Sequence, residues 1–372
     1  MSKQKRIDKI VERYGDKIKN INDLTGGKEP SKLFYILARH LDYLLDTDPD
    51  VCVKKYGVKI RRTLNPIVKK IAPLFMNSKQ VIEDREKLMY PKGRKKKDKD
   101  KPRYSKTIEL PEEPVIWMAN HAFKDDVVAT ICAAKRHGYL LLGSVPQFYN
   151  TFDGIAAFVN GVVMANRKVK ASKKASLEKS VRVMEYGADL IMFPEGVWNK
   201  SPNQLTLPLW RGAYEIAKQT GAKIVPIVHY IKDPTLTTPK EDNPFHTVVD
   251  NPIDVSEMSE KEALEAISEK FSTWHFLMME KYGQTTREEA LAGYESSQEA
   301  WDEQLRLRSK TADKYDFEME TKADYRPKEI VLPEDVFSSI ADLELTRENA
   351  VEVLAARKIV RERKDNDFQR RF

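Results

Sequence analysis

Between residues 113 and 282 the chain alternates short apolar runs with amphipathic helical segments, and this alternation constrains its fold most strongly. The apolar runs are predicted to be buried strands, and they read PVIWMAN, YLLLGSV, GVVMANR, DLIMFPEG, KIVPIVHYI and TVVDNPIDV. Strands that are apolar on both faces are typical of parallel sheets covered by helices. The chain is therefore predicted to be an α/β protein with a mainly parallel sheet flanked by helices.

The helical segments between these runs have recognisable ends. One predicted helix ends at Gly138 and another at Gly187, because glycine is the usual residue just past a helix end. RGAYEIAKQTG predicts a third helix. The last helix begins with a capping box of Ser259 and Glu262. It then carries an apolar stripe at helical spacing, formed by Leu264, Ile267, Phe271 and Trp274.

Composition and periodicity divide the chain into four parts. These are a helical N-terminal region (1–90), a basic linker (91–112), the α/β domain (113–282) and a charged helical C-terminal extension (283–372). In the first part, PSKLFYILARHLDYLLD has one apolar helical face. The segment VKKYGVKIRRTLNPIVKKIAPLF is also helical in period, and Pro66 and Pro73 are expected to break it. It is predicted to belong to a helical bundle with a solvated basic face. Contact with a membrane surface is the alternative.

Charge and cysteine content limit the partners and the compartment. The 372 residues include 64 Lys and Arg against 57 Asp and Glu, a net charge of +7 that suits an anionic partner. The lysine-rich linker lacks interleaved aromatic residues, so nucleic acid is not expected. Two distant cysteines argue against a disulfide framework or a CxxC zinc site and favour the reducing cytoplasm. No signal peptide and no spanning helix are expected.

The stretch MANHAFKDDVVA holds the residues best suited to chemistry. His121 follows a predicted buried strand, where sites form in parallel sheets, and Asp126 falls in the first turn of the next helix. A carboxylate that accepts from one imidazole nitrogen fixes the tautomer, and the other nitrogen can then take a proton. No serine or cysteine nucleophile accompanies this pair, so a hydroxyl of the substrate is the candidate nucleophile. Asp125 is expected to be a helix N-terminal charge.

Four short blocks, in this order, resemble the glycerolipid acyltransferases of the lysophosphatidate acyltransferase group. NHAFKDD matches the NHxxxxD signature through Asn120, His121 and Asp126. The later blocks are GVVMANR, FPEG and IVPI, each in a predicted strand or at its end. The resemblance covers roughly residues 113–232.

The resemblance implies roles for the matching positions. His121 would deprotonate an acceptor hydroxyl that attacks an acyl thioester, and Asp126 would orient His121 and stabilise its protonated form. Arg167 would bind a phosphate group of the acceptor, and Arg211 would be a second ligand of that phosphate. Glu195 and Gly196 would also bind the acceptor. Those implied to support the site are Asn120, Pro194 and Pro226. The family often continues FPEG with Thr-Arg-Ser, whereas this chain has Val197, Trp198 and Asn199, with Lys200 as a possible substitute.

The resemblance also implies the partners. The acceptor would be a lysophospholipid or glycerol phosphate, and the donor acyl-CoA or an acyl carrier protein, without a metal or redox cofactor. A cytoplasmic enzyme at the inner face of an anionic membrane is expected.

Two other interpretations remain open. The first is a non-catalytic module that binds an anionic surface. The second is a cation held by His121, Asp125, Asp126 and Glu195, but there is no HExxH pattern to support it. The other histidines, at positions 40, 137, 229, 246 and 275, are expected to be structural or on the surface.

Overall fold

The computed structural model describes residues 44, 47–76, 78–93, 95, 103–122, 125–143, 157–165, 170–199, 205–232, 241–284, 341–346, 349–350, 353–358 and 360–361. The chain forms two units, residues 1–320 and 321–372. The helix predicted around residues 30–46 lies outside the described residues except for Leu44, which is helical and buried.

Within the described part of the first unit, a single sheet has the strand order β1-β7-β6-β2-β5-β3-β4. Its strands are β1 (Gln80–Ile82), β2 (Ile116–Ala119), β3 (Gly138–Leu142), β4 (Val162–Met164), β5 (Asp189–Met192), β6 (Ile224–Tyr230) and β7 (Phe245–Val249). Neighbouring strands are parallel except β6 and β7, which are antiparallel. The prediction of a mainly parallel sheet flanked by helices is confirmed.

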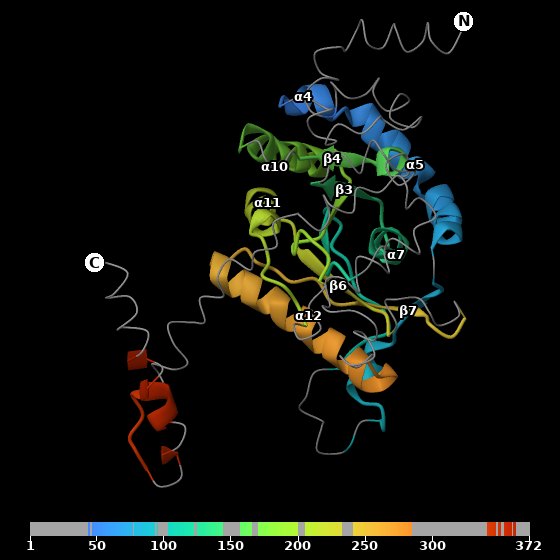
Figure 1. Cartoon of the computed structure of the whole chain (residues 1–372). Coiled ribbons are helices and arrows are strands. Elements are labelled where there is room, and N and C mark those ends of the chain that lie inside the picture. The colour runs from blue at the N-terminus through green and yellow to red at the C-terminus, as the bar shows by residue number, and fades with distance from the viewer. Residues whose placement is uncertain are drawn as a thin grey trace, which may run out of the picture. The chain divides into compact units, whose positions relative to one another are not determined.

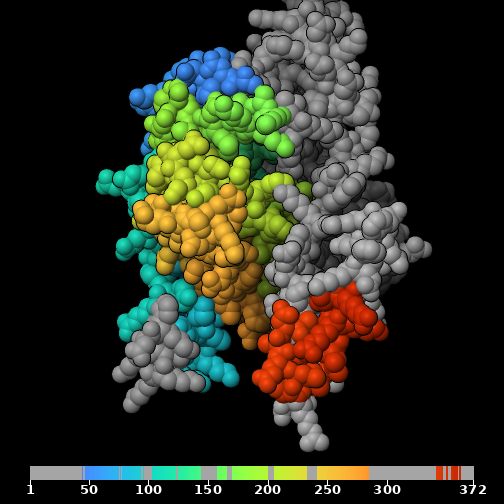
Figure 2. Space-filling view, turned by 90° about the vertical axis from the view of Figure 1, so that its left-hand side faces the viewer, coloured from blue at the N-terminus to red at the C-terminus, as the bar shows by residue number. Residues whose placement is uncertain are grey.

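Helices cover both faces of this sheet. They are α4 (Pro49–Cys52), α5 (Lys55–Ile71), the 3-10 turn η2 (Ala72–Phe75), α6 (Arg85–Met89), α7 (Asp126–Ala133), α10 (Lys170–Glu185), α11 (Gly212–Thr220) and α12 (Glu260–Tyr282). The helices α10, α11 and α12 lie on one face, and α7 lies on the other (Figure 1). The helix α5 contributes to both cores, with Val58 packed in the first and Val68 in the second. Figure 2 shows the first face, where α10, α11 and α12 lie side by side.

The central strand β2 shows why its sequence is apolar throughout. Ile116 and Met118 pack into the core under α10, α11 and α12, whereas Trp117 and Ala119 pack into the core under α7. All four side chains are fully buried. Successive residues of a strand point to opposite faces, so a strand covered on both sides needs apolar residues at every position.

Two expectations about helix ends are wrong. The helix α5 continues through Pro66, because this proline lies on the exposed face, where water can bond the carbonyl it leaves unpaired. The helix after His121 ends at Ala133, and Gly138 is instead the first residue of β3. A Cβ atom there would lie 2.8 Å from the Ile191 side chain, so close packing between strands requires this glycine.

The N-terminal segment also differs from its all-helical prediction. Residues 80–82 form β1, which pairs in parallel with β7 at the sheet edge. The segment QVI is too short for its periodicity to separate a strand from a helix. In the second unit, the described residues around 350–361 are helical, as the C-terminal pattern indicates, and Arg357 Nε donates to Ala341 O at 2.8 Å.

Candidate active site

The candidate site lies where the central strands β2 and β5 end. Asn120 and His121 follow β2 directly, and the block from Phe193 to Gly196 follows β5. Because β2 and β5 are parallel neighbours, their carboxyl ends meet at one edge of the sheet. This edge is the position at which α/β proteins usually build sites.

His121 and Asp126 form the chemical centre of this site. The Nδ1 atom of His121 lies 2.6 Å from Oδ2 of Asp126. Asp126 is fully buried in the first turn of α7, and the His121 side chain is 19% exposed. The predicted pair is therefore in contact, and the carboxylate orients the imidazole ring through Nδ1. Asp125 is the N-cap residue of α7, the helix start expected for it.

Glu195 joins three parts of the site through its buried carboxylate. Its Oε2 atom accepts from the His121 main-chain N–H at 2.6 Å. Its Oε1 atom accepts from the main-chain N–H of Leu207 at 2.8 Å and from the Thr206 hydroxyl at 3.0 Å. Burial raises the pKa of Glu195 to about 7, although these donors and His121 oppose the rise. The sequence contains no signal for Thr206 and Leu207, because they come from a separate loop.

The loop after β5 wraps the imidazole. The ring of Phe193 lies 4.7 Å from that of His121, and the ring of Trp198 lies 5.7 Å away in an edge-on arrangement. The Asn199 N–H donates to the His121 carbonyl at 2.8 Å. Trp198, at the position where the resembling family often has arginine, therefore forms an aromatic wall of the site.

Gly196 and Pro194 shape this loop. Gly196 has φ +74°, and a Cβ atom there would lie 3.1 Å from Nε1 of Trp210. Both the positive φ and the close ring favour glycine. The carbonyl of Pro194 accepts from Trp210 N–H at 2.9 Å, so the turn is fastened to the segment before α11.

A buried network below His121 was not predicted. The side chain of Asn120 bonds the main chain of His229 twice, with Nδ2 donating to its carbonyl at 3.1 Å and Oδ1 accepting from its N–H at 2.6 Å. The His229 ring in turn lies 2.7 Å from Thr130 Oγ1 on α7 and 3.0 Å from Thr247 Oγ1 on β7. Burial, and then the charge of His121, lower the pKa of His229 to about 3. A lone histidine in an apolar strand offers no sequence signal for such a network.

The remaining predicted residues either lie apart from His121 and Asp126 or fall outside the residues that the structure describes. Arg167 and Lys200 lie outside the described residues. Arg211 is 65% exposed, and its guanidinium lies 3.5 Å from Glu215 and 3.6 Å from Glu260, whose carboxylates compete with any phosphate. Pro226 is buried in β6 opposite Met118.

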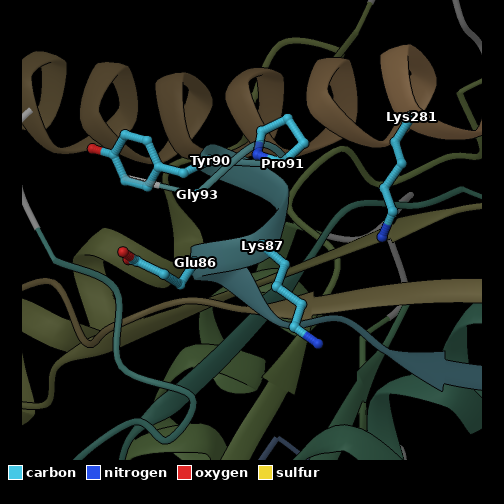
Figure 3. Close-up of a pocket in the computed structure, with 6 residues that line it drawn as sticks. All are labelled: Glu86, Lys87, Tyr90, Pro91, Gly93 and Lys281. Carbon is cyan, nitrogen blue, oxygen red and sulfur yellow. The ribbon is translucent and has the colours of Figure 1, made fainter. Parts of the chain in front are cut away.

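A shallow hollow of about 420 Å³ lies elsewhere on the same unit, between α6 and the end of α12 (Figure 3). The ammonium groups of Lys87 and Lys281 lie on one side of it and the carboxyl group of Glu86 on the other. Its other lining residues are Tyr90, Pro91 and Gly93. None of the predicted site residues lines this hollow.

The fold and the site define an α/β protein with a histidine–aspartate pair at the carboxyl edge of a mainly parallel sheet. Residues 72–230 match the family model described as Acyltransferase. This part of the chain, less than half of its length, is similar to the acyltransferases.

Comparison with individual proteins gives partial matches. A 1-acyl-sn-glycerol-3-phosphate acyltransferase of Chlamydomonas reinhardtii is 26% identical over 117 residues, which are 32% of this chain and 34% of that protein. One from Borreliella burgdorferi is 33% identical over 116 residues, 31% of this chain and 45% of that protein. The chain thus matches less than half the length of these relatives. The solved 1-acyl-sn-glycerophosphate acyltransferase PlsC of Thermotoga maritima superposes with a TM-score of 0.42 at 18% identity, over 73% of this chain and 99% of that one.

Proposed function

We propose that the protein transfers a fatty acyl group from a thioester donor to the hydroxyl of a lysophospholipid or glycerol phosphate. The observation that carries this proposal is the 2.6 Å contact between His121 and Asp126 at the end of β2. The family match and the relatives named as 1-acyl-sn-glycerol-3-phosphate acyltransferases support the same chemistry. The donor is acyl-CoA or an acyl carrier protein, and the enzyme works in the cytoplasm at the inner face of the membrane.

In this mechanism His121 is the general base. Its Nε2 atom takes the proton of the acceptor hydroxyl as the oxygen attacks the thioester carbonyl. The new C–O bond forms, the C–S bond breaks, and the proton passes from His121 to the leaving thiolate. Asp126 keeps Nδ1 protonated and stabilises the imidazolium that forms in between.

The remaining residues position this pair and bind the acceptor. Glu195 is a positioning residue, because both of its oxygens accept hydrogen bonds from the loops around His121. The acceptor phosphate is assigned to Arg167 on the strength of the GVVMANR block, since a guanidinium fork matches phosphate oxygens. Arg211 is a weaker phosphate ligand, because its guanidinium already lies beside two carboxylates.

The test is an acceptor screen with a radiolabelled acyl donor, followed by lipid extraction. The wild-type protein should label one lysophospholipid or glycerol phosphate acceptor. The His121→Ala variant should lose about 10²- to 10⁴-fold of the rate, the usual contribution of a general base. Its circular dichroism and thermal unfolding midpoint should match the wild type, because the ring is partly exposed.

Two outcomes would contradict the proposal. Unchanged turnover by His121→Ala would remove His121 from the mechanism. Binding of the wild-type protein to anionic vesicles, without transfer to any acceptor, would favour the non-catalytic binding module.

A further inference from the structure

The helix α12 lies beyond residues 72–230, the part of the chain that matches the family model, yet it contacts a loop of the candidate site. The Nδ1 atom of His275 lies 2.8 Å from the main-chain oxygen of Leu205. A carbonyl oxygen only accepts hydrogen bonds, so Nδ1 carries a proton and donates it. This bond attaches α12 to the segment that supplies Thr206 and Leu207 to the site.

The helix α12 is a firm support for this bond. Phe271, Trp274 and Met278 bury its inner side in the core between the helix and the sheet. Tyr230, at the end of β6, belongs to the same core, and its ring lies 5.5 Å from that of His275. Close packing leaves buried groups little freedom to move. The position of the His275 ring relative to the sheet is therefore set by the core.

From Leu205 the contacts lead on to His121. Leu205 immediately precedes Thr206 and Leu207. The hydroxyl of Thr206 and the N–H of Leu207 both donate to Oε1 of Glu195, at 3.0 and 2.8 Å. Its other oxygen, Oε2, accepts from the His121 N–H at 2.6 Å. A carboxylate group is planar and rigid, so moving the donors at one oxygen also moves the other.

We propose that His275 is a positioning residue for His121. Its bond to Leu205 holds the two donors that place Glu195, and Glu195 in turn holds the main chain of His121. The effect on catalysis rests on the proposed acyl transfer, in which His121 is the base, whereas the effect on the loop does not. Because His275 acts through other residues, its loss should change the rate more than the binding of substrates.

Two substitutions separate the hydrogen bond of His275 from its packing. Burial lowers the pKa of His275, although the bond to Leu205 opposes this shift, so the ring is neutral near pH 7 with its proton on Nδ1. His275→Asn keeps an N–H donor close to the place of Nδ1, whereas His275→Leu keeps apolar bulk and removes the donor. Positioning requires that the asparagine variant resembles the wild type and the leucine variant does not. Packing alone predicts the reverse.

The first measurement is steady-state acyl transfer by the full chain, with the acceptor concentration varied. We expect His275→Leu to lower kcat about 10- to 100-fold and to leave KM within about twofold, because a displaced base costs rate and not binding. His275→Asn should stay within about threefold of the wild-type kcat. Thr206→Val should lower kcat as well, and combining it with His275→Leu should add little, since both act through Glu195.

The second measurement, hydrogen–deuterium exchange, does not depend on activity. It follows the peptides that contain the Leu207 and His121 amides, which both donate to Glu195. His275→Leu should speed exchange about tenfold in both peptides, and His275→Asn should leave both slow. If the wild-type protein transferred no acyl group, the proposed function would fail, but these exchange rates would still test whether His275 places the His121 loop.

Phe276→Leu is the matched control, because Phe276 is the next residue of α12 and is 54% exposed. This variant should match the wild type in kcat and in exchange. If His275→Leu does not fold, Thr206→Val carries the test, because it breaks the same route to Glu195 and leaves α12 intact.

Three results would overturn the proposal. His275→Leu, or Thr206→Val in its place, could keep the wild-type kcat and exchange rates. The leucine and asparagine variants of His275 could lose the same activity. Finally, exchange could rise in the Leu207 peptide alone, which would show that the loop moves without moving His121.

Discussion

At the scale of single residues, the site depends on which of two adjacent aspartates contacts the histidine. Asp126 meets His121 at 2.6 Å, whereas Asp125 occupies the N-cap position of α7. The sequence motif selects the same residue through its spacing. This spacing places Asp126 in the first turn of α7, from which its side chain points back toward His121 at the end of β2.

We expect Asp126→Asn to lower the acyl transfer rate by about 10²-fold or more, because an amide cannot stabilise the imidazolium. The measurement is kcat with a saturating acceptor, and the wild-type KM should be largely retained. Asp125→Asn is the control, with an expected rate close to that of the wild type. If both substitutions lowered the transfer rate equally, the contact between Asp126 and His121 would not be the cause of the loss.

At the scale of secondary-structure elements, β6 contacts both segments that carry the His121–Asp126 pair. His229 of this strand bonds Asn120, the residue before His121, and Thr130, one turn after Asp126 on α7. The strand thus connects the loop of His121 to the helix of Asp126. The network is buried, so its hydrogen bonds are costly to break.

This network predicts a specific pH dependence of stability. The pKa of His229 is about 3 in the folded protein and about 6.5 when unfolded. Between these values the unfolded chain binds a proton that the folded chain does not, so acidification favours unfolding. We expect the unfolding free energy of the wild type to fall more steeply between pH 6 and 5 than that of His229→Gln, by about 1 kcal/mol per pH unit. Urea titrations at pH 6 and pH 5 measure the free energy of unfolding of each protein. An equal decrease in the wild type and in His229→Gln would disprove the prediction.

At the scale of the whole α/β unit, buried charges attach the segment before residue 113 to the last helix. Asp250, just after β7, accepts from Arg85 of α6 at 2.9 Å and from the Trp274 indole of α12 at 2.7 Å. Glu83 binds His246, Lys281 and Tyr282. Burial would raise the pKa of Glu83, but these hydrogen bonds outweigh it and lower the pKa to about 2.

We expect Asp250→Asn to lower the free energy of unfolding by about 3–5 kcal/mol, because it leaves the Arg85 guanidinium buried without its counter-charge. Chemical denaturation followed by tryptophan fluorescence measures the change. Asp254→Asn is the matched control, since Asp254 pairs with Lys223 on the exposed surface and its loss should hardly matter. Similar effects of the two substitutions would contradict the structural role of Asp250.

The local features of this protein can be predicted from its amino-acid sequence. Apolar strands, glycine-ended helices such as α10, the Ser259 capping box and the His121–Asp126 spacing all depend on neighbours within a few residues. Such patterns follow from helix and strand geometry and are visible in a linear chain.

The contacts between distant segments depend on how the elements pack and could not be predicted from the sequence. Glu195 meets Leu207 and His121 because two loops converge at one edge of the sheet, and His229 meets Thr130 because α7 packs on β6. The basic helix α5 was predicted to bury its apolar residues in a bundle, yet it exposes them. Periodicity shows that a helix has an apolar face, but only packing determines whether that face meets the protein core or its surroundings.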